Sequence, residues 1–166
     1  KDVSGSENEF SNSLYGLKSE NAYFTLLNNI FSQIGDITNS TTPGACVFAT
    51  SDFDFSDREI KIGNGFNTGG ENIFKNSTNG VVIKGESSVA IKGNTFGDAS
   101  AFNDRLTDIC ISIKEAGSKE ILIQNQNYFY DYTHAIDIGN ISGRIYLNNN
   151  KFWNSVFPSG ATAFEG

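Results

Sequence analysis

The stretch from Asn72-Ile73-Phe74 to Asn94-Thr95-Phe96 contains one complete unit of a repeating pattern. Between the two tripeptides lie residues 80–84 (GVVIK) and 89–92 (VAIK), two short runs with apolar residues at alternate positions, separated by residues 85–88 (GESS). Alternation with a period of two is typical of a β-strand that buries one face. The unit therefore predicts short strands joined by turns, and no window of the sequence shows a convincing helical period.

The tripeptide Asn-x-Phe recurs along the whole chain. Its six copies end at Phe10, Phe31, Phe74, Phe96, Phe129 and Phe152. Three of the five intervals between them are of nearly equal length: Phe10 to Phe31, Phe74 to Phe96, and Phe129 to Phe152. A fixed period of this length, about 22 residues, is the sequence signature of a solenoid, in which each repeat stacks on the next.

The two longer intervals require insertions. We interpret the stretch between Phe31 and Phe74 as one long coil with strands at residues 45–48 and 60–62; the alternative divides it in two at Phe53. Between Phe96 and Phe129 the extra residues fall at 97–108. Both ends of the chain stop within a repeat, which predicts that these 166 residues are one β-helix domain excerpted from a longer solenoid, or one capped by something outside it.

Units of about 22 residues with two or three short strands and no helix predict an all-β parallel β-helix of roughly six to seven coils, with longer side loops. The six anchor phenylalanines are expected to form an internal stack. The asparagines two positions before them are expected to form a turn ladder, because asparagine tolerates left-handed dihedral angles and its amide can bond the backbone or the next asparagine.

The pattern I-x-x-N-x-F, followed by a glycine and another apolar run, resembles the right-handed parallel β-helix repeats of pectate-lyase-like and other secreted or cell-surface bacterial proteins. The resemblance covers nearly the whole chain. It implies a right-handed solenoid and a secreted or cell-surface location, but proteins with this fold serve as enzymes, adhesins and spacers alike.

The composition disfavours some partners. Asp and Glu number 19 against 12 Lys and Arg, a net charge of −7, and an acidic surface without basic clusters disfavours nucleic acid. No apolar run is long enough for a membrane span. The sequence also predicts no cofactor and no metal site.

The polygalacturonase-like signatures Asn-Thr-Asp, Asp-Asp, Gly-His-Gly and Arg-Ile-Lys do not occur in the sequence. The nearest acidic cluster is Asp52, Asp54 and Asp57 with Arg58, which is either a set of solvated loop residues or an acid/base or calcium site. His134 has a carboxylate three positions away on each side, at Asp131 and Asp137; it is either a turn residue or a general base.

Aromatic residues provide the stronger functional indication. Tyr130 and Trp153 follow their anchor phenylalanines at the same position, so we expect them to stack one coil apart. Tyr128, Tyr132 and Tyr146 are expected nearby, with Asp131 and Asn154 beside them. Such rings either stabilise the solenoid or bind the apolar faces of sugars; the candidate carbohydrate-binding residues are Tyr130, Trp153, Tyr128, Asp131 and His134.

The two cysteines allow a disulfide, a buried thiol pair or two unrelated thiols. In our alignment of the repeats Cys46 matches Val82 and Cys110 matches Asp137, on the face opposite the core, with at least one coil between them. That separation predicts free thiols.

Three functional hypotheses follow. The first is a non-enzymatic structural or adhesive segment of a secreted or cell-surface solenoid, partnered by flanking coils or a cap and in contact with glycans. The alternatives are a polysaccharide-degrading lyase or glycosidase, and a non-catalytic carbohydrate-binding module.

Overall fold

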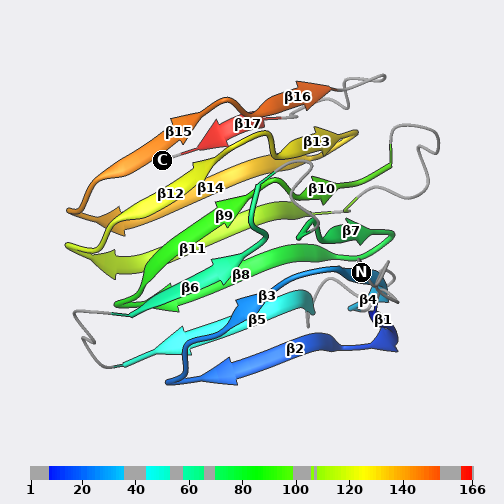
Figure 1. Ribbon diagram of the computed structural model, residues 1–166, viewed down its shortest axis with the longest axis horizontal. Coiled ribbons are helices and arrows are strands. Elements are labelled where there is room, and N and C mark those ends of the chain that lie inside the picture. The colour runs from blue at the N-terminus through cyan, green and yellow to red at the C-terminus, as the bar shows by residue number, and fades with distance from the viewer. Residues whose placement is uncertain are drawn as a thin grey trace, which may run out of the picture.

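The computed structural model describes residues 8–35, 44–52, 58–65, 70–98, 106, 108–153 and 162–165. Within these ranges every regular element is a β-strand, and the strands pair in parallel in three sheets. Figure 1 shows the strands lying one above another, from β2 at the bottom to β16 at the top. The described residues contain no helix long and apolar enough to cross a membrane.

Within each sheet the strands lie side by side in the order in which they occur along the chain, and every third strand belongs to the same sheet. Sheet A contains β1 (Asn8–Ser13), β4 (Asn29–Ile34), β7 (Ile73–Lys75), β10 (Thr95–Phe96), β13 (Tyr128–Tyr130) and β16 (Lys151–Trp153). Sheet B contains β2 (Tyr15–Glu20), β5 (Ala45–Ser51), β8 (Asn79–Gly85), β11 (Ile109–Gly117), β14 (His134–Ile141) and β17 (Thr162–Glu165). Sheet C contains β3 (Thr25–Leu26), β6 (Glu59–Ile62), β9 (Ser88–Lys92), β12 (Ile121–Gln124) and β15 (Ile145–Asn148).

The chain visits sheets A, B and C in turn and then returns to sheet A, where the new strand pairs with the previous one. We call one such passage a coil. The arrangement is compatible with the predicted parallel β-helix. The stretch between Phe31 and Phe74 is a single passage, because these two residues pair directly; the described residues between them contribute β5 to sheet B and β6 to sheet C. Division at Phe53, which lies outside the described residues, is therefore wrong.

The anchor phenylalanines form the predicted internal stack. Their rings follow one another at centroid distances of 4.9, 5.2, 4.8, 5.0 and 4.9 Å, and neighbouring ring planes are within 14° of parallel. The four central rings are fully buried, whereas Phe152 at the end of the stack is 42% exposed. Register pairs each phenylalanine with the next, so the repeat in the sequence is a repeat in space.

The predicted asparagine ladder is also present. Each amide Nδ2 donates to the Oδ1 of the next asparagine, through Asn8, Asn29, Asn72, Asn94, Asn127 and Asn150. The conformational reason given for it is wrong, because none of these six is among the described residues with positive φ. The predicted bonding is confirmed: the amides bond the next amide and, along the ladder, the backbone, as when Asn94 Nδ2 donates to the Ile62 carbonyl at 2.9 Å.

The cysteines are free, as predicted, but our alignment misplaced them. Sheet B pairs Phe48 with Val82 and Ser112 with Asp137, so Cys46 and Cys110, two positions earlier, share a row with Gly80, which lies between them. Both thiols are buried in the hydrophobic core rather than on the opposite face. There is little space for a side chain at Gly80, because a Cβ there would lie 3.0 Å from Cδ1 of Phe96, a ring of the phenylalanine stack.

Candidate functional site

The outer face of sheet A carries two rows of side chains, one on each side of the buried phenylalanines. Register aligns Ile30, Ile73, Thr95, Tyr128 and Lys151 in the first row. The second row contains Ser32, Lys75, Gly97, Tyr130 and Trp153, in which Gly97 directly follows β10. Both rows point outward because each member is next to an inward-facing phenylalanine in the sequence.

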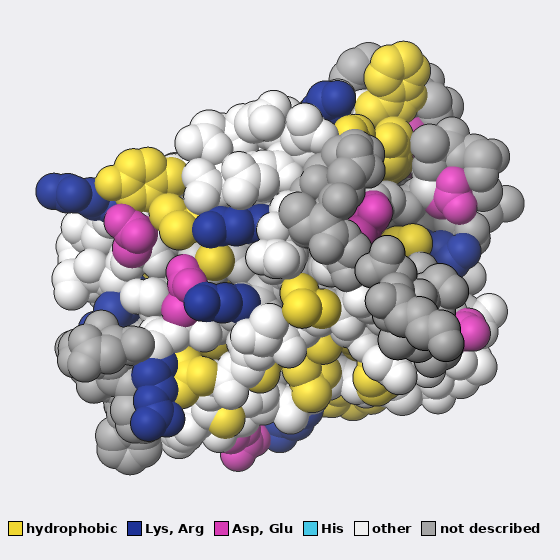
Figure 2. All heavy atoms as spheres, in the orientation of Figure 1, with side chains coloured by type: hydrophobic (Ala, Val, Ile, Leu, Met, Phe, Trp, Pro, Cys, Tyr) yellow, Lys and Arg dark blue, Asp and Glu magenta, His cyan; other side chains and the backbone are white. Residues whose placement is uncertain are grey.

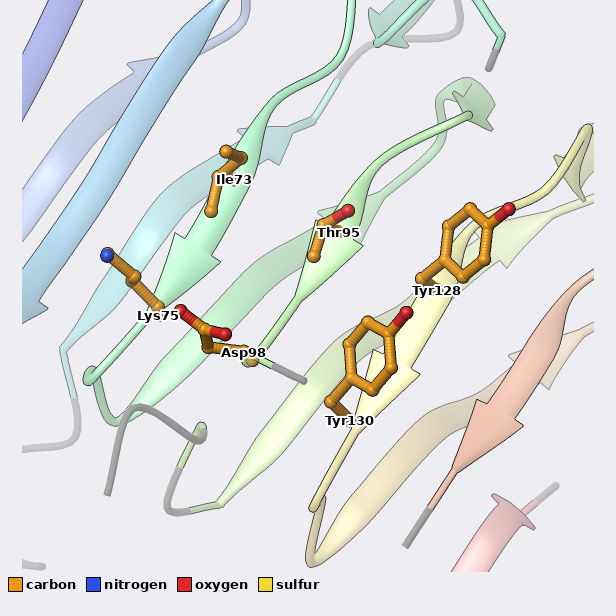
Figure 3. Close-up of a pocket in the computed structure, with 7 residues that line it drawn as sticks. Ile73, Lys75, Thr95, Asp98, Tyr128 and Tyr130 are labelled. Carbon is orange, nitrogen blue, oxygen red and sulfur yellow. The ribbon is translucent and has the colours of Figure 1, made fainter. Parts of the chain in front are cut away.

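A hollow of about 450 Å³ lies over these rows. It is lined by Ile73, Lys75, Thr95, Gly97, Asp98, Tyr128 and Tyr130 (Figure 3). Gly97 stands between Lys75 and Tyr130 and has no side chain, so the row is interrupted there. The backbone at Gly97 has φ +87°, and a Cβ would lie 2.4 Å from the Tyr130 carbonyl oxygen, so a larger residue is excluded at this position.

Two tyrosines form one wall of the hollow. Tyr128 and Tyr130 lie on β13 with one residue between them; their rings are within 5° of parallel and their centroids are 6.1 Å apart. Figure 3 shows the rings side by side with their hydroxyl groups pointing the same way. The ammonium group of Lys151 lies 5.1 Å from the centroid of Tyr128, a cation–π contact that helps to orient this ring.

Polar groups border the rings. Thr95 donates its hydroxyl hydrogen to Oε1 of Glu71, and Lys75 and Asp98 also line the hollow (Figure 3). Burial raises the pKa of Tyr130; Tyr128 and the carboxylates of Glu71 and Asp98 raise it further, whereas Lys151 lowers it. The Tyr130 phenol is therefore protonated at neutral pH and can donate a hydrogen bond to a ligand.

Trp153 is the register partner of Tyr130, as predicted. The ring that stacks on Tyr130 is nevertheless that of Tyr128, on the same strand, and the expected stack with Trp153 does not form. Trp153 is 65% exposed, more than any other large hydrophobic residue that the structure describes. Hydrophobic side chains stand out at the upper right of Figure 2, where Figure 1 shows β16.

Two other tyrosines do not belong to this face. Tyr132 is buried and packs edge-on against Phe152, with ring centroids 6.2 Å apart. Tyr146 lies on β15 in sheet C, paired with Leu122. Proximity in the sequence was misleading for both, because a coil turns from one sheet to the next within a short length of chain. Asn154 lies outside the described residues.

Asp131 and His134 are near the hollow in sequence but do not line it. Asp131 is a buried residue in the turn after β13, with φ 47°, and its N–H donates to the Trp153 carbonyl at 2.9 Å. His134 begins β14 in sheet B, and its N–H donates to the Asp108 carbonyl at 3.1 Å. The other neighbouring carboxylate, Asp137, forms an ion pair with Lys114.

The acidic cluster is only partly described. The Asp52 side chain is exposed and its N–H donates to Oδ1 of Asn21 at 2.8 Å, whereas Asp54 and Asp57 lie outside the described residues. Arg58 lies over the ring of Tyr23 at 5.7 Å and lines a second, more polar hollow of about 470 Å³ beside β3 and β6. Among the described residues no group of three His, Cys, Asp or Glu side chains could hold a metal ion.

Tyr128 and Tyr130 were predicted from the sequence, but the other polar and small residues of the hollow, Lys75, Thr95, Gly97 and Asp98, were missed. The sequence does indicate their position, because residues on either side of an anchor phenylalanine must face outward. Alignment of those flanking positions from coil to coil would have placed Lys75, Gly97 and Tyr130 in one row. Comparison of the chain with protein-family models, with curated proteins and with solved structures gives no match.

Proposed function

We propose that this chain is a segment of a right-handed parallel β-helix of a secreted or cell-surface bacterial protein, built from six to seven coils. It acts as a rigid scaffold that presents a carbohydrate-binding, adhesive face on sheet A. The continuous phenylalanine stack and asparagine ladder support the scaffold part of the proposal, because they tie every coil to the next.

One observation carries the binding part: two parallel tyrosine rings lie beside a hollow whose floor includes a glycine that interrupts a row of side chains. The apolar face of a sugar ring packs on an aromatic ring, and neighbouring polar groups bond its hydroxyls. Here the polar groups are the Tyr130 phenol, Lys75 and Asp98. A hollow of this size and mixed character suits a sugar better than a purely apolar ligand.

Binding is favoured over catalysis in this proposal. Asp131 and His134 are outside the lining of the hollow, and Asp137 is engaged by Lys114. The side chains of Ile145, Leu147 and Phe152 are exposed at the end of the stack of coils, which supports flanking coils or a cap as the structural partner. Nucleic-acid binding and membrane insertion are not part of the proposal.

The test is binding to a panel of neutral and acidic polysaccharides, measured for the wild-type chain and for Tyr130→Ala. We expect the substitution to weaken binding by about tenfold or more, because it removes the central ring of the site. Tyr146→Ala is the matched control, since Tyr146 is a partly exposed tyrosine on sheet C. Circular dichroism checks that both variants retain the β-sheet fold.

Two outcomes would overturn the proposal. The first is that no polysaccharide binds the wild-type chain, and the second is that Tyr130→Ala binds as tightly as Tyr146→Ala. The release of new reducing ends or unsaturated products during incubation would instead identify a polysaccharide-degrading enzyme. That result would reject the non-catalytic assignment.

A further inference from the structure

The outer row of sheet A that contains the hollow continues beyond it onto an exposed aromatic ring. Lys75, Gly97, Tyr130 and Trp153 occupy successive positions of this row on β7, β10, β13 and β16. Neighbouring strands are about 4.8 Å apart, so the row spans about 14 Å from β7 to β16. This length exceeds a single sugar ring and matches a short saccharide chain.

We infer that the site binds an extended saccharide lying across the strands, with one sugar in the hollow at Gly97 against Tyr130 and a later sugar on Trp153. The inference rests on the proposed carbohydrate-binding function and adds the ligand class, an oligosaccharide or polysaccharide chain rather than a single sugar, and its direction.

The exposure of Trp153 supports this placement. The other exposed large hydrophobics at the same end of the molecule, on β15 and β16, are between 37% and 42% exposed, whereas Trp153 is 65% exposed. Phe152 points into the core and stacks on Phe129, so alternation directs its neighbour Trp153 outward. Its exposure therefore reflects its outward direction, on the face that carries Tyr130, as well as its place at the end of the stack.

The position of the hollow determines the direction in which the saccharide crosses the sheet. A ligand parallel to the strands would lie along Tyr128 and Tyr130, but the empty volume is on the Lys75 side of Tyr130, where Gly97 provides no side chain. A chain that fills the hollow and continues past Tyr130 reaches Trp153 next. Lys151 occupies the same strand as Trp153 but belongs to the other row, where it lies over Tyr128.

The experiment measures affinity against ligand length by isothermal titration calorimetry. The probes are cello-oligosaccharides, manno-oligosaccharides and oligogalacturonides, each from the single sugar upward. For the series that binds, we expect the Kd of the wild-type chain to fall with length and then level off. Trp153→Ala should weaken the longer ligands by about tenfold or more and leave the shortest ligand unchanged.

Tyr146→Ala is the matched control, because it truncates an exposed aromatic ring at the same end of the molecule, on sheet C, and should preserve the length dependence. An affinity that does not depend on length, or a Trp153→Ala effect equal for all lengths, would overturn the extended ligand while binding that needs Tyr130 still stands. If none of the three series binds the wild-type chain, or if Tyr130→Ala has no effect, the proposed function fails and this inference fails with it.

Discussion

The ring of Phe96 lies parallel to the ring of Phe129, with centroids 5.0 Å apart and planes within 4°, although the inserted stretch 97–108 lies between them in the chain. The same contact joins Phe74 and Phe96 at 4.8 Å across a coil that has no such insertion. The extra residues of the longer coil thus leave the stack undisturbed. Side loops in this fold can vary in length because only the strand positions must match between coils.

Replacement of Phe96 by alanine should lower the free energy of unfolding by roughly 3–5 kcal/mol. Phe96 is fully buried between two stacked rings, so the truncation removes apolar contacts and leaves a cavity. Urea unfolding followed by circular dichroism measures the change. Phe152→Ala, which truncates the 42% exposed ring at the end of the stack, should cost less. A loss below about 1 kcal/mol for Phe96→Ala would contradict a stabilising role for the internal stack.

Replacement of Asn94 by alanine should destabilise the fold by roughly 2–4 kcal/mol. Asn94 is fully buried; its Oδ1 accepts from the backbone and side-chain nitrogens of Asn72 at 3.2 and 2.9 Å, and its Nδ2 donates to the Ile62 carbonyl. Without the amide these buried groups lose partners that water cannot replace. Thermal and urea unfolding measure the loss.

The exposed first member of the ladder, Asn8, provides the control. Asn8→Ala removes one bond to Asn29 where water can take its place, so the change in unfolding free energy should be much smaller. Equal losses for Asn8→Ala and Asn94→Ala would show that the ladder does not stabilise the fold through buried hydrogen bonds.

Gly80→Ala should destabilise the chain by about 1–3 kcal/mol, although it adds only one methyl group. The new Cβ would lie 2.4 Å from the Cys110 carbonyl oxygen and 3.0 Å from Cδ1 of Phe96, and neither the backbone nor a stacked ring can give way easily. In Gly139→Ala the first atom met is the flexible end of Lys114, so that variant should be neutral or slightly stabilised. Differential scanning calorimetry compares the two, and the opposite ranking would refute the steric argument.

The buried thiols should make the fold less stable at high pH. Burial raises the pKa of Cys46 from an ordinary value of 9.0 to about 12, and burial raises the pKa of Cys110 as well. Above about pH 9 the unfolded chain releases thiol protons that the folded chain retains, so stability present at lower pH is lost as the pH rises toward the folded values. Each thiol steepens this loss by up to about 1.4 kcal/mol per pH unit.

Urea unfolding at a series of pH values checks this linkage. The double variant Cys46→Ala with Cys110→Ala should lose stability less steeply than the wild-type chain above about pH 9, while tyrosine and lysine titrations remain common to both. Parallel curves for the two proteins would mean that the thiols ionise as readily in the folded state as in the unfolded state.

The sequence predicted a large part of the fold, because the same local pattern recurs in every coil. Asn72 to Phe96 contains the anchor, two alternating strands and the next anchor, so it was sufficient to predict a stack of parallel strands with phenylalanine inside and asparagine in a ladder. Each coil then places the same residue above its predecessor. The long stretch between Phe31 and Phe74 could be interpreted in two ways until the pairing of those two residues resolved it.

The candidate site was predicted only in part. Tyr130 and Trp153 were aligned correctly, because both directly follow an anchor phenylalanine. Tyr146 was misplaced, since its neighbourhood depends on where the chain turns from one sheet to another. The alignment of the repeats placed Cys46 and Cys110 two positions away from their observed register. Their strands follow insertions, whose length obscures the alignment.

The sequence by itself determined the repeat, the inward phenylalanines and the asparagine ladder, because these follow from local periodicity and from residues that bond their own equivalents in the next coil. Only the tertiary structure decided where the outer face is hollow. The hollow lies over Gly97, which carries no side chain and is flanked in register by Lys75 and Tyr130, residues far from it in the chain and on other strands. Contacts between coils, rather than within one, create that space.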